Sequence, residues 1–387
     1  MLNLNLVSRI LRGTINSEYF TRLYIKHTYP EGKGYSPMQV KQTTFKQLNE
    51  TVQYNCHVAD ASHAGDYTLC IYLLKMREFY RWEQQASLST NLDSKHIGLW
   101  LKQREHLWES LEDDEFSPLL INDQPYDPFN SNEINQLINH SQLVYSAGYG
   151  LNNRPHFFLA DLEQHEQHSH YELFIAGKEH ARDMSAPPAM SIDNKIFIRK
   201  ESFRRLLWEK LETWRWNRPD NALGRAFACY DCENDLDQAL IQMSDAEVRN
   251  VIEHEKGEIE AGKLLGPRWE ELLYALPYSK ASIMLRAIRD HLADTLTTLP
   301  ALLQLDHPAS WHFYFGNLNN MRKSLFPALN TAYEHWVKTG SLNELAQIIE
   351  KSKSHWLTLC EEILNINEPD IKTRQRLIQD LIENRHL

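Results

Sequence analysis

One stretch of the chain, residues 244–266, places ionisable side chains on an apolar helical face. At about 100° per residue, its apolar positions fall on a single side: Val248, Val251, Ile252, Ile259 and Gly262. Glu255 lies near the centre of that side, and His254 and Glu258 lie next to it. Because a buried carboxylate is costly unless it is paired, protonated or bound to a metal, Glu255 requires a positive partner.

Two carboxylates and an imidazole on one helix are typical of iron or manganese sites in helical bundles. The sequence therefore predicts His254, Glu255 and Glu258 as metal ligands and catalytic residues, with His254 as ligand or proton carrier. A zinc protease is excluded, because Glu258 stands where the motif H-E-x-x-H requires its second histidine. The alternative is an ion pair between Glu255 and a buried arginine such as Arg286 or Arg322.

Two further groups of residues could complete such a metal site. They are His63, Asp66 and Glu78 in one group, and His291 and Asp294 in the other. The alternative for the first group is that Asp66 caps a helix that follows a histidine-containing loop. The alternative for the second is that Asp294 belongs to a solvated face, opposite a stripe of leucines.

Helices must position these residues. Ser244 and Glu247 form a capping box, S-x-x-E, which predicts the start of a helix that Gly266 and Pro267 end. A second helix is predicted from Ala281 to Leu299, where leucines and isoleucines recur at helical spacing.

Three short segments have the composition of strands. Residues 156–163, 171–176 and 195–200 are rich in β-branched and aromatic side chains and are bounded by Gly, Pro, Asn and Asp. They predict a small antiparallel sheet of about three strands. The Pro-rich residues 183–194 are predicted to be irregular.

These elements predict a mainly α protein, with helical bundle regions and a small antiparallel β insertion. We expect an N-terminal helical domain over residues 1–150, the sheet over 151–200 and a C-terminal helical bundle over 201–387.

Composition limits the partners. The net charge of −11 over 387 residues disfavours nucleic acid and anionic membranes, so a small molecule or another protein is expected. The N-terminal residues contain no apolar run of signal-peptide length, and the cysteine count of five is odd, which together predict a cytoplasmic protein with reduced thiols. Cys229 and Cys232 form a C-x-x-C pair, interpreted as buried thiols with a redox role left open.

Residues 201–218 mix arginine, tryptophan and glutamate. Such a mixture can stack nucleotides, but here Phe203, Leu207 and Trp214 form a packing stripe, so core contacts and ion pairs are predicted instead. The chain has no glycine-rich phosphate loop and no G-x-S-x-G motif.

Three segments resemble an uncharacterised bacterial protein family of unknown function. They are H-E-K-G-E at 254–258, R-D-H-L-A-D at 289–294 and A-R-D-M-S-A-P-P-A at 181–189. The resemblance implies a bacterial cytosolic protein and assigns no catalytic residue.

Two functions therefore remain open. The first is a metal-dependent enzyme of the oxidoreductase type, with a carboxylate and histidine site for a divalent metal such as iron or manganese. The second is a non-catalytic helical protein that binds a partner and contains buried ion-pair networks.

Overall fold

The computed structural model describes residues 42–150, 154–192, 194–276 and 279–387. The prediction made for the first residues of the chain lies outside the described part. The chain divides into two compact units, one ending at Trp208 and the other starting at Glu209, and each is described by itself. The three-region division predicted from the sequence stays a prediction.

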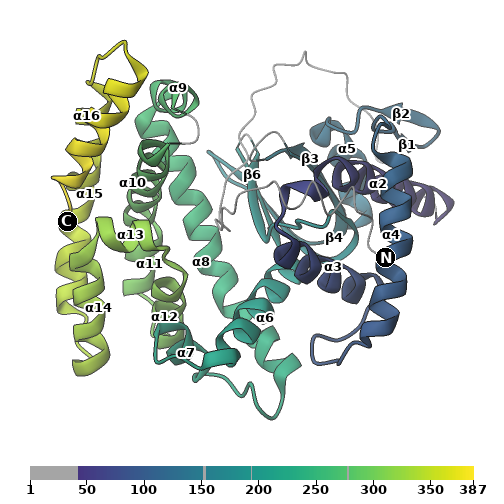
Figure 1. Cartoon of the computed structure of the whole chain (residues 1–387), viewed down its shortest axis with the longest axis horizontal. Coiled ribbons are helices and arrows are strands. Elements are labelled where there is room, and N and C mark those ends of the chain that lie inside the picture. Colours follow the sequence, from purple (N-terminus) through teal and green to yellow (C-terminus); the bar gives the residue numbers. More distant parts are fainter. Residues whose placement is uncertain (1–41, 151–153, 193, 277–278) are drawn as a thin grey trace. The chain divides into compact units, whose positions relative to one another are not determined.

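The first unit combines helices with two sheets (Figure 1). Its helices are α2 (Gln42–His63), η1 (Ala64–Asp66), α3 (Leu69–Glu83), α4 (Ser94–Leu111), α5 (Ser131–Ile138), η2 (Asn139–Ser141) and the start of α6 (Lys200–Asn217). Its strands are β1 (Leu119–Ile121), β2 (Gln124–Tyr126), β3 (Leu143–Tyr149), β4 (Pro155–Gln167), β5 (Glu172–Arg182), β6 (Ala189–Ile192) and β7 (Lys195–Arg199).

The larger sheet has the strand order β3-β4-β5-β7-β6. Strands β5 and β7 are parallel, and the other neighbours are antiparallel. The pairing of β4 with β5 shifts register three times between Leu159 and Gln164, and such bulges bend a strand. The sheet is therefore mixed and curled.

Each face of this sheet has its own apolar core. On one face, Leu48 and Val52 of α2 pack with Ile134 of α5 against Phe157 and Leu159. On the other face, apolar side chains from all five strands pack together: Val144, Phe158, Ala160, Phe174, Ala176, Met190 and Phe197. Alternation along β4 explains the split, because neighbouring strand residues point to opposite faces.

The sequence-based prediction of this region was correct in type but too small. The three predicted strands correspond to β4, β5 and β7, whereas β3, β6 and the β1–β2 hairpin were missed. The sheet is mixed because β7 joins β5 in parallel, and β6 lies within residues 183–194, which were predicted to be irregular. The mainly helical character of the described chain is confirmed.

The second unit is helical in its described residues. Its helices after α6 are α7 (Ala222–Phe227), α8 (Leu236–Leu265), α9 (Pro267–Ala275), α10 (Lys280–Leu296), α11 (Thr298–Leu303), α12 (Pro308–Asn317), α13 (Asn320–Leu325), α14 (Pro327–Thr339), α15 (Asn343–Leu364) and α16 (Ile371–Glu383). Among the described residues, no helix is both long and apolar enough to cross a membrane.

Helix α10 is the centre of this unit. It contacts α8, α11, α13, α15 and α16, and Figure 1 shows α8 and α10 running side by side. Its leucine stripe enters the core, as Leu285, Ile288 and Leu292 are fully buried. Asp294 is only 1% exposed as well, so the solvated face considered for this helix is wrong, because neighbouring helices cover it on several sides.

Helix α8 begins earlier than the capping box predicts. Its N-cap is Asp235, whose side chain accepts a hydrogen bond from the N–H of Gln238. Ser244 lies inside the helix, where its hydroxyl donates to the carbonyl of Ile241 in the preceding turn. The predicted end at Gly266 is confirmed, and Pro267 begins α9.

Gly257 sets how closely α8 approaches α10. A Cβ atom at this position would collide with the carbonyl oxygen of Ala293 and the hydroxyl of Thr297. That hydroxyl also donates to the carbonyl of Glu253 at 2.6 Å, which ties the two helices together. Gly257 is thus required for the packing of α8 against α10.

We expect Gly257→Ala to destabilise the second unit by roughly 1–3 kcal/mol, because backbone atoms of α10 must move to admit the methyl group. Gly98→Ala in α4 is the matched control, since nothing lies within 4 Å of its Cβ position. It should stabilise by roughly 0.5–1 kcal/mol through helix propensity alone. Denaturant unfolding measures both, and equal effects of the two substitutions would contradict this role for Gly257.

Candidate functional site

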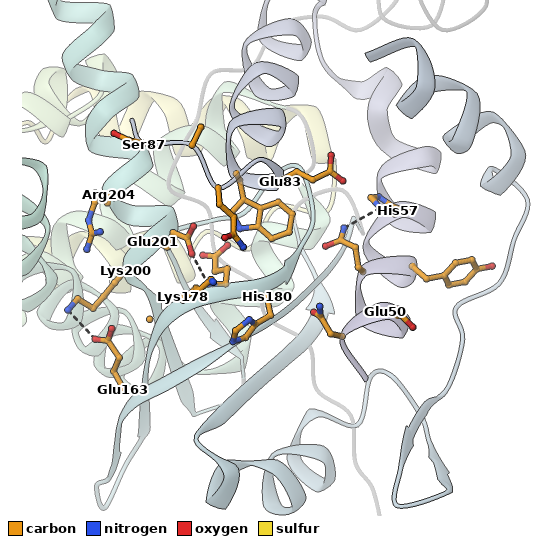
Figure 2. Close-up of a pocket in the computed structure, with 18 of the residues that line it drawn as sticks. Glu50, His57, Glu83, Ser87, Glu163, Lys178, His180, Lys200, Glu201 and Arg204 are labelled. Carbon is orange, nitrogen blue, oxygen red and sulfur yellow. Dashed lines mark hydrogen bonds and ion pairs between the residues drawn. The ribbon is translucent and has the colours of Figure 1, made fainter. Parts of the chain in front are cut away.

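The first unit contains a pocket of about 1000 Å³ between α2, the end of α3, β5 and the start of α6 (Figure 2). We call it the Glu201 pocket. Its ionisable lining comprises Glu50, His57, Glu83, Glu163, Lys178, Glu179, His180, Lys200, Glu201 and Arg204. A pocket of this size fits a metabolite-sized ligand.

Most charged side chains of the Glu201 pocket are already paired. Lys200 Nζ lies 3.1 Å from Glu163 Oε2, and Glu83 accepts a hydrogen bond from Arg104. His180 Nε2 contacts Asp161 Oδ1 at 2.6 Å. These pairs fix the walls and cancel most of their own charge.

Two cations of the pocket form no such pair. Neither the ammonium of Lys178 nor the guanidinium of Arg204 forms an ion pair with any residue that the structure describes. The Nε atom of Arg204 is also buried without a hydrogen-bond partner in the described part of the chain. These two groups are therefore available to a ligand.

Glu201 is a carboxyl group with one fixed oxygen. Its Oε2 accepts a hydrogen bond from the N–H of Glu179 at 2.7 Å. Burial, and next the negative charge of Glu179, raise the pKa of Glu201 to about 7, against a smaller opposing effect of Arg199 and Arg204. A carboxyl group with a pKa near neutral pH can both release and accept a proton there.

His57, on another wall, is held neutral. Arg104 Nη1 donates to His57 Nε2 at 2.6 Å, so that nitrogen is an acceptor. Burial and the charge of Arg104 lower the pKa of His57 to about 3. His57 therefore orients Arg104 and does not act as a base near neutral pH.

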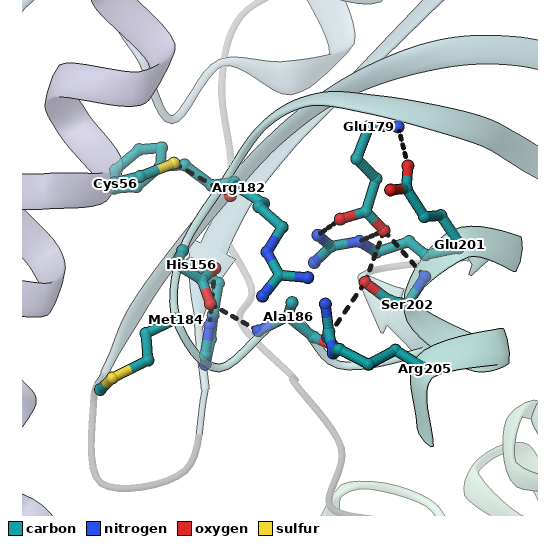
Figure 3. Close-up of polar contacts among 12 residues, drawn as sticks. Cys56, His156, Glu179, Arg182, Met184, Ala186, Glu201, Ser202 and Arg205 are labelled. Carbon is teal, nitrogen blue, oxygen red and sulfur yellow. Dashed lines mark hydrogen bonds and ion pairs between the residues drawn. The ribbon is translucent and has the colours of Figure 1, made fainter. Parts of the chain in front are cut away.

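A fully buried ion pair lies behind Glu201 (Figure 3). Arg199 of β7 donates from Nε and Nη2 to the two oxygens of Glu179, at 3.1 and 2.7 Å. Ser202 adds hydrogen bonds from its N–H and its hydroxyl, at 3.2 and 2.5 Å. Glu179 thereby accepts an N–H from the first turn of α6, where helix donors otherwise lack partners.

Arg182, near this pair, forms no ion pair with a carboxylate among the residues that the structure describes. It is 1% exposed, and its Nε and Nη1 atoms have no hydrogen-bond partner among the described residues. Its guanidinium lies over the rings of Phe79 and Trp82, at 5.5 and 5.1 Å from their centres. Ring faces therefore stabilise this cation in place of an anion.

A second acidic pair is buried next to the turn after β5. Asp183 contacts His156 Nδ1 at 3.2 Å and accepts the N–H of Ala186 at 2.7 Å. Asp60 of α2 accepts from Arg154 Nη2 at 3.3 Å and from the N–H of Met184 at 2.8 Å. Burial and the charge of Asp183 raise the pKa of Asp60 to about 8. The hydrogen bond from Met184 to Asp60 connects α2 to the turn.

In the second unit, two of the predicted groups meet. His254 Nδ1 lies 2.7 Å from Asp294 Oδ1, and His254 Nε2 lies 3.4 Å from Glu258 Oε1. Arg322 and the hydroxyl of Tyr314 both donate to Asp294 Oδ2, the latter at 2.9 Å. Asp294 is thus the centre of a buried network.

The charges of this network support one another. Burial favours the neutral form of Asp294, but Arg322 and His254 outweigh it and hold the pKa of that carboxyl well below its usual range. Burial also opposes the charge of His254, yet Asp294 raises the pKa of the imidazole well above its ordinary value. The network therefore consists of an imidazolium, a guanidinium and a carboxylate.

The other predicted residues have individual partners. Glu255 is buried, at 7% exposed, while His291 stacks on Trp356 and contacts the carbonyl of Arg322 through Nε2 at 2.9 Å. Burial and Arg322 lower the pKa of His291 to about 3.

In the first unit, His63 and Asp66 form a hydrogen bond of 2.9 Å at the end of α2. Glu78 is buried on α3, where it accepts from Arg77 at 2.7 Å and Arg81 at 3.0 Å. No group of three or more His, Cys, Asp or Glu side chains in the described residues is placed to hold a metal ion. The metal-enzyme interpretation therefore lacks support. Arg322 binds Asp294, and the predicted ion pair between Glu255 and Arg286 or Arg322 stays a prediction.

The cysteine pair differs from its prediction in one respect. Cys232 is buried, but Cys229 is exposed. Burial raises the pKa of Cys229 and raises that of Cys232 to about 11, so neither thiol is readily ionised at neutral pH.

Of the residues that line the Glu201 pocket, the sequence singled out only His57 as a candidate, in a group with His63, Asp66 and Glu78. Glu201 and Arg204 were assigned to ion pairs because they stand in a helix rich in both charges. Arg199 could have indicated a buried ion pair. It lies two residues after Phe197 in a strand, so both side chains point to the same, buried face. Its partner Glu179 could not be found without the parallel pairing of β5 and β7.

The protein has two units. The first contains a curled mixed sheet, its helices and the charged pocket, and the second is helical with a buried ion-pair network. The chain belongs to a family of unknown function, DUF6866. The model of the family's N-terminal domain matches residues 47–199, and that of its C-terminal domain matches residues 204–385. No curated protein and no solved structure matches the chain.

The two buried arginines of the first unit should respond differently to removal of their charge. Arg199→Met leaves Glu179 buried without its cation and should cost roughly 3–5 kcal/mol of unfolding free energy. Arg182→Met removes no hydrogen bond of the guanidinium and should change stability by less than about 1 kcal/mol. Denaturant unfolding compares the two, and a larger loss in Arg182→Met would show that Arg182 has an anionic partner.

The His254 network predicts a pH dependence of the second unit. Because the folded pKa of His254 is raised, its stabilisation is complete below the unfolded value of about 6.5 and is lost as pH rises through the folded pKa. Asp294 acts oppositely, since its depressed pKa gives stability above about pH 4 that is lost on further acidification. Hydrogen exchange of α10 should show protection falling from about pH 6 upward in the wild type, and less steeply in His254→Asn.

Proposed function

We propose that the first unit binds a small anionic molecule in the Glu201 pocket. The observation that carries this proposal is the pair of cations, Lys178 and Arg204, that line the pocket without a carboxylate partner among the described residues. A guanidinium that lines a pocket without an ion pair can donate charge-assisted hydrogen bonds to a phosphate or carboxylate oxygen.

The other walls suit such a ligand. Glu163 and Glu83 are neutralised by Lys200 and Arg104, so they repel an anion less than bare carboxylates would. Trp82 contributes an aromatic surface to the lining. The pocket therefore combines a binding point for negative charge with an apolar contact, which is the usual composition of a metabolite site.

A role in protein interaction, the other expected type of partner, concerns the second unit. The His254 network is buried and internally paired, which supports a structural role for those charges. The small-molecule proposal therefore rests on the first unit alone.

Isothermal titration calorimetry of the full chain with succinate, sulfate and pyrophosphate tests this proposal. We expect at least one probe to bind, and Arg204→Gln to raise its Kd by roughly tenfold or more, since a charge-assisted hydrogen bond contributes about 1.5–3 kcal/mol. Lys178→Gln should have a smaller effect, because Lys178 is exposed.

Lys102→Gln provides the control, because Lys102 is exposed on α4 and does not line the pocket. It should leave Kd unchanged. Failure of all three anions to bind, or an equal loss of affinity in Lys102→Gln and Arg204→Gln, would contradict the proposal.

A further inference from the structure

Glu201 occupies an unusual position for a carboxyl group in a pocket. Its Oε2 is held by the N–H of Glu179, and neither of its oxygens forms an ion pair with a residue that the structure describes. Figure 2 shows Glu201 among the lining residues, near Lys178. The second oxygen, Oε1, has no hydrogen bond to a described residue and is the one available to a ligand.

The charges that face Glu201 come from three elements. From β5, Glu179 adds a like charge, and from β7, Arg199 adds a positive charge that is already bound to Glu179 on both oxygens. From α6 itself, Arg204 lies one helical turn further on and attracts Glu201 from beyond ion-pair distance. Lys178 of β5 and the Lys200–Glu163 pair complete the charged lining.

Burial and the charge of Glu179 have the largest effects on the protonation of Glu201, and Arg204 adds a smaller attraction. Of the two pocket cations on α6, Lys200 is paired with Glu163, whereas Arg204 forms no ion pair with a described residue. The attraction of Arg204 favours the ionised form of Glu201. A bound anion would accept hydrogen bonds from Arg204 and would bring a second negative charge close to the carboxylate. Both changes disfavour ionised Glu201.

We infer that Glu201 takes up a proton from solvent when an anionic ligand binds next to Arg204, and that the resulting carboxylic acid donates a hydrogen bond from Oε1 to the ligand. This inference rests on the proposed anion binding. The step is balanced: one carboxylate and one solvent proton become one carboxylic acid, and no other bond changes. Glu201 is thereby the group of this pocket that can exchange a proton with a bound molecule.

The inference narrows the class of ligand. A carboxylic acid donates one hydrogen bond, and a guanidinium donates several, so the complementary group is an oxyanion with more than one acceptor oxygen. Carboxylates and phosphates meet this requirement, whereas a halide offers no separate oxygens.

Calorimetry in two buffers of different ionisation enthalpy counts the protons taken up on binding. At about pH 8, roughly one unit above its pKa of about 7, Glu201 is mostly ionised in the free protein. Binding of whichever of succinate, sulfate or pyrophosphate forms a complex should take up more than about half a proton. In Glu201→Gln this uptake should disappear, and subtracting the variant from the wild type removes any titration of the probe itself.

The variant should keep its fold, because a glutamine oxygen still accepts the N–H of Glu179. Its Kd should be nearly constant with pH, whereas the Kd of the wild type should rise by up to about tenfold per pH unit above pH 7. Glu163→Gln, which alters a carboxylate already paired with Lys200, should retain the wild-type proton uptake.

The outcomes separate the two proposals. Absence of binding to all three probes overturns the proposed function and this inference with it. Binding that Arg204→Gln weakens, but with equal proton uptake in the wild type and Glu201→Gln, leaves anion binding intact and overturns the role of Glu201 alone.

Discussion

The buried ion pair between Glu179 and Arg199 is the constraint on which the first unit depends. It joins β5 to β7 beyond their backbone hydrogen bonds, and through Ser202 it also joins both strands to the start of α6. Two charges that are 0% exposed are stable only when both carboxylate oxygens and the facing donors are occupied. Both oxygens of Glu179 are occupied here, by Nε and Nη2 of Arg199, although Nη1 of Arg199 has no hydrogen-bond partner among the described residues. The pair thereby fixes Glu201, the residue directly before Ser202, at the wall of the pocket.

The second unit uses the same physical solution around Asp294. There the buried carboxylate accepts from Arg322, Tyr314, Thr298 and His254, so it remains ionised although it is 1% exposed. Close approach of α8 is needed to bring His254 within hydrogen-bond distance, and Gly257 permits that approach. Asp60 in the first unit differs from Asp294. Among the described residues it accepts a hydrogen bond from one cation, Arg154, at 3.3 Å, and burial raises its pKa.

The sequence predicted the elements better than it predicted their partners. The strands β4, β5 and β7 and the buried stripe of α10 were found because alternation and helical spacing are local properties. Strand β6 was missed, since two prolines precede it, and β3 was missed because it follows directly after a short helix. The sequence selected both His254 and Asp294 as candidates, but it did not predict their contact. That contact joins residues forty positions apart on two different helices.

A metal site and an ion-pair network look alike in one sequence. Both place a histidine and carboxylates on the buried side of a helix, because both remove charge from water and require compensation. What distinguishes them is the source of the positive charge, and here it is Arg322, which lies in a separate short helix, α13. No spacing rule connects that position to α8 or α10, so the pattern alone could not decide.

In the Glu201 pocket, Glu201 and Arg204 do not form an ion pair with each other. Glu201 and Arg204 are three residues apart on α6, a spacing at which opposite charges on a helix commonly pair. Instead, the N–H of Glu179 holds one oxygen of Glu201 against the sheet, and Arg204 remains without a carboxylate among the described residues. A surface pair at this spacing would gain only about 0.3–0.5 kcal/mol, less than a backbone hydrogen bond to a charged acceptor contributes. The hydrogen bond from the sheet is therefore favoured over the ion pair with Arg204, and Glu201 and Arg204 both line the pocket without pairing to each other.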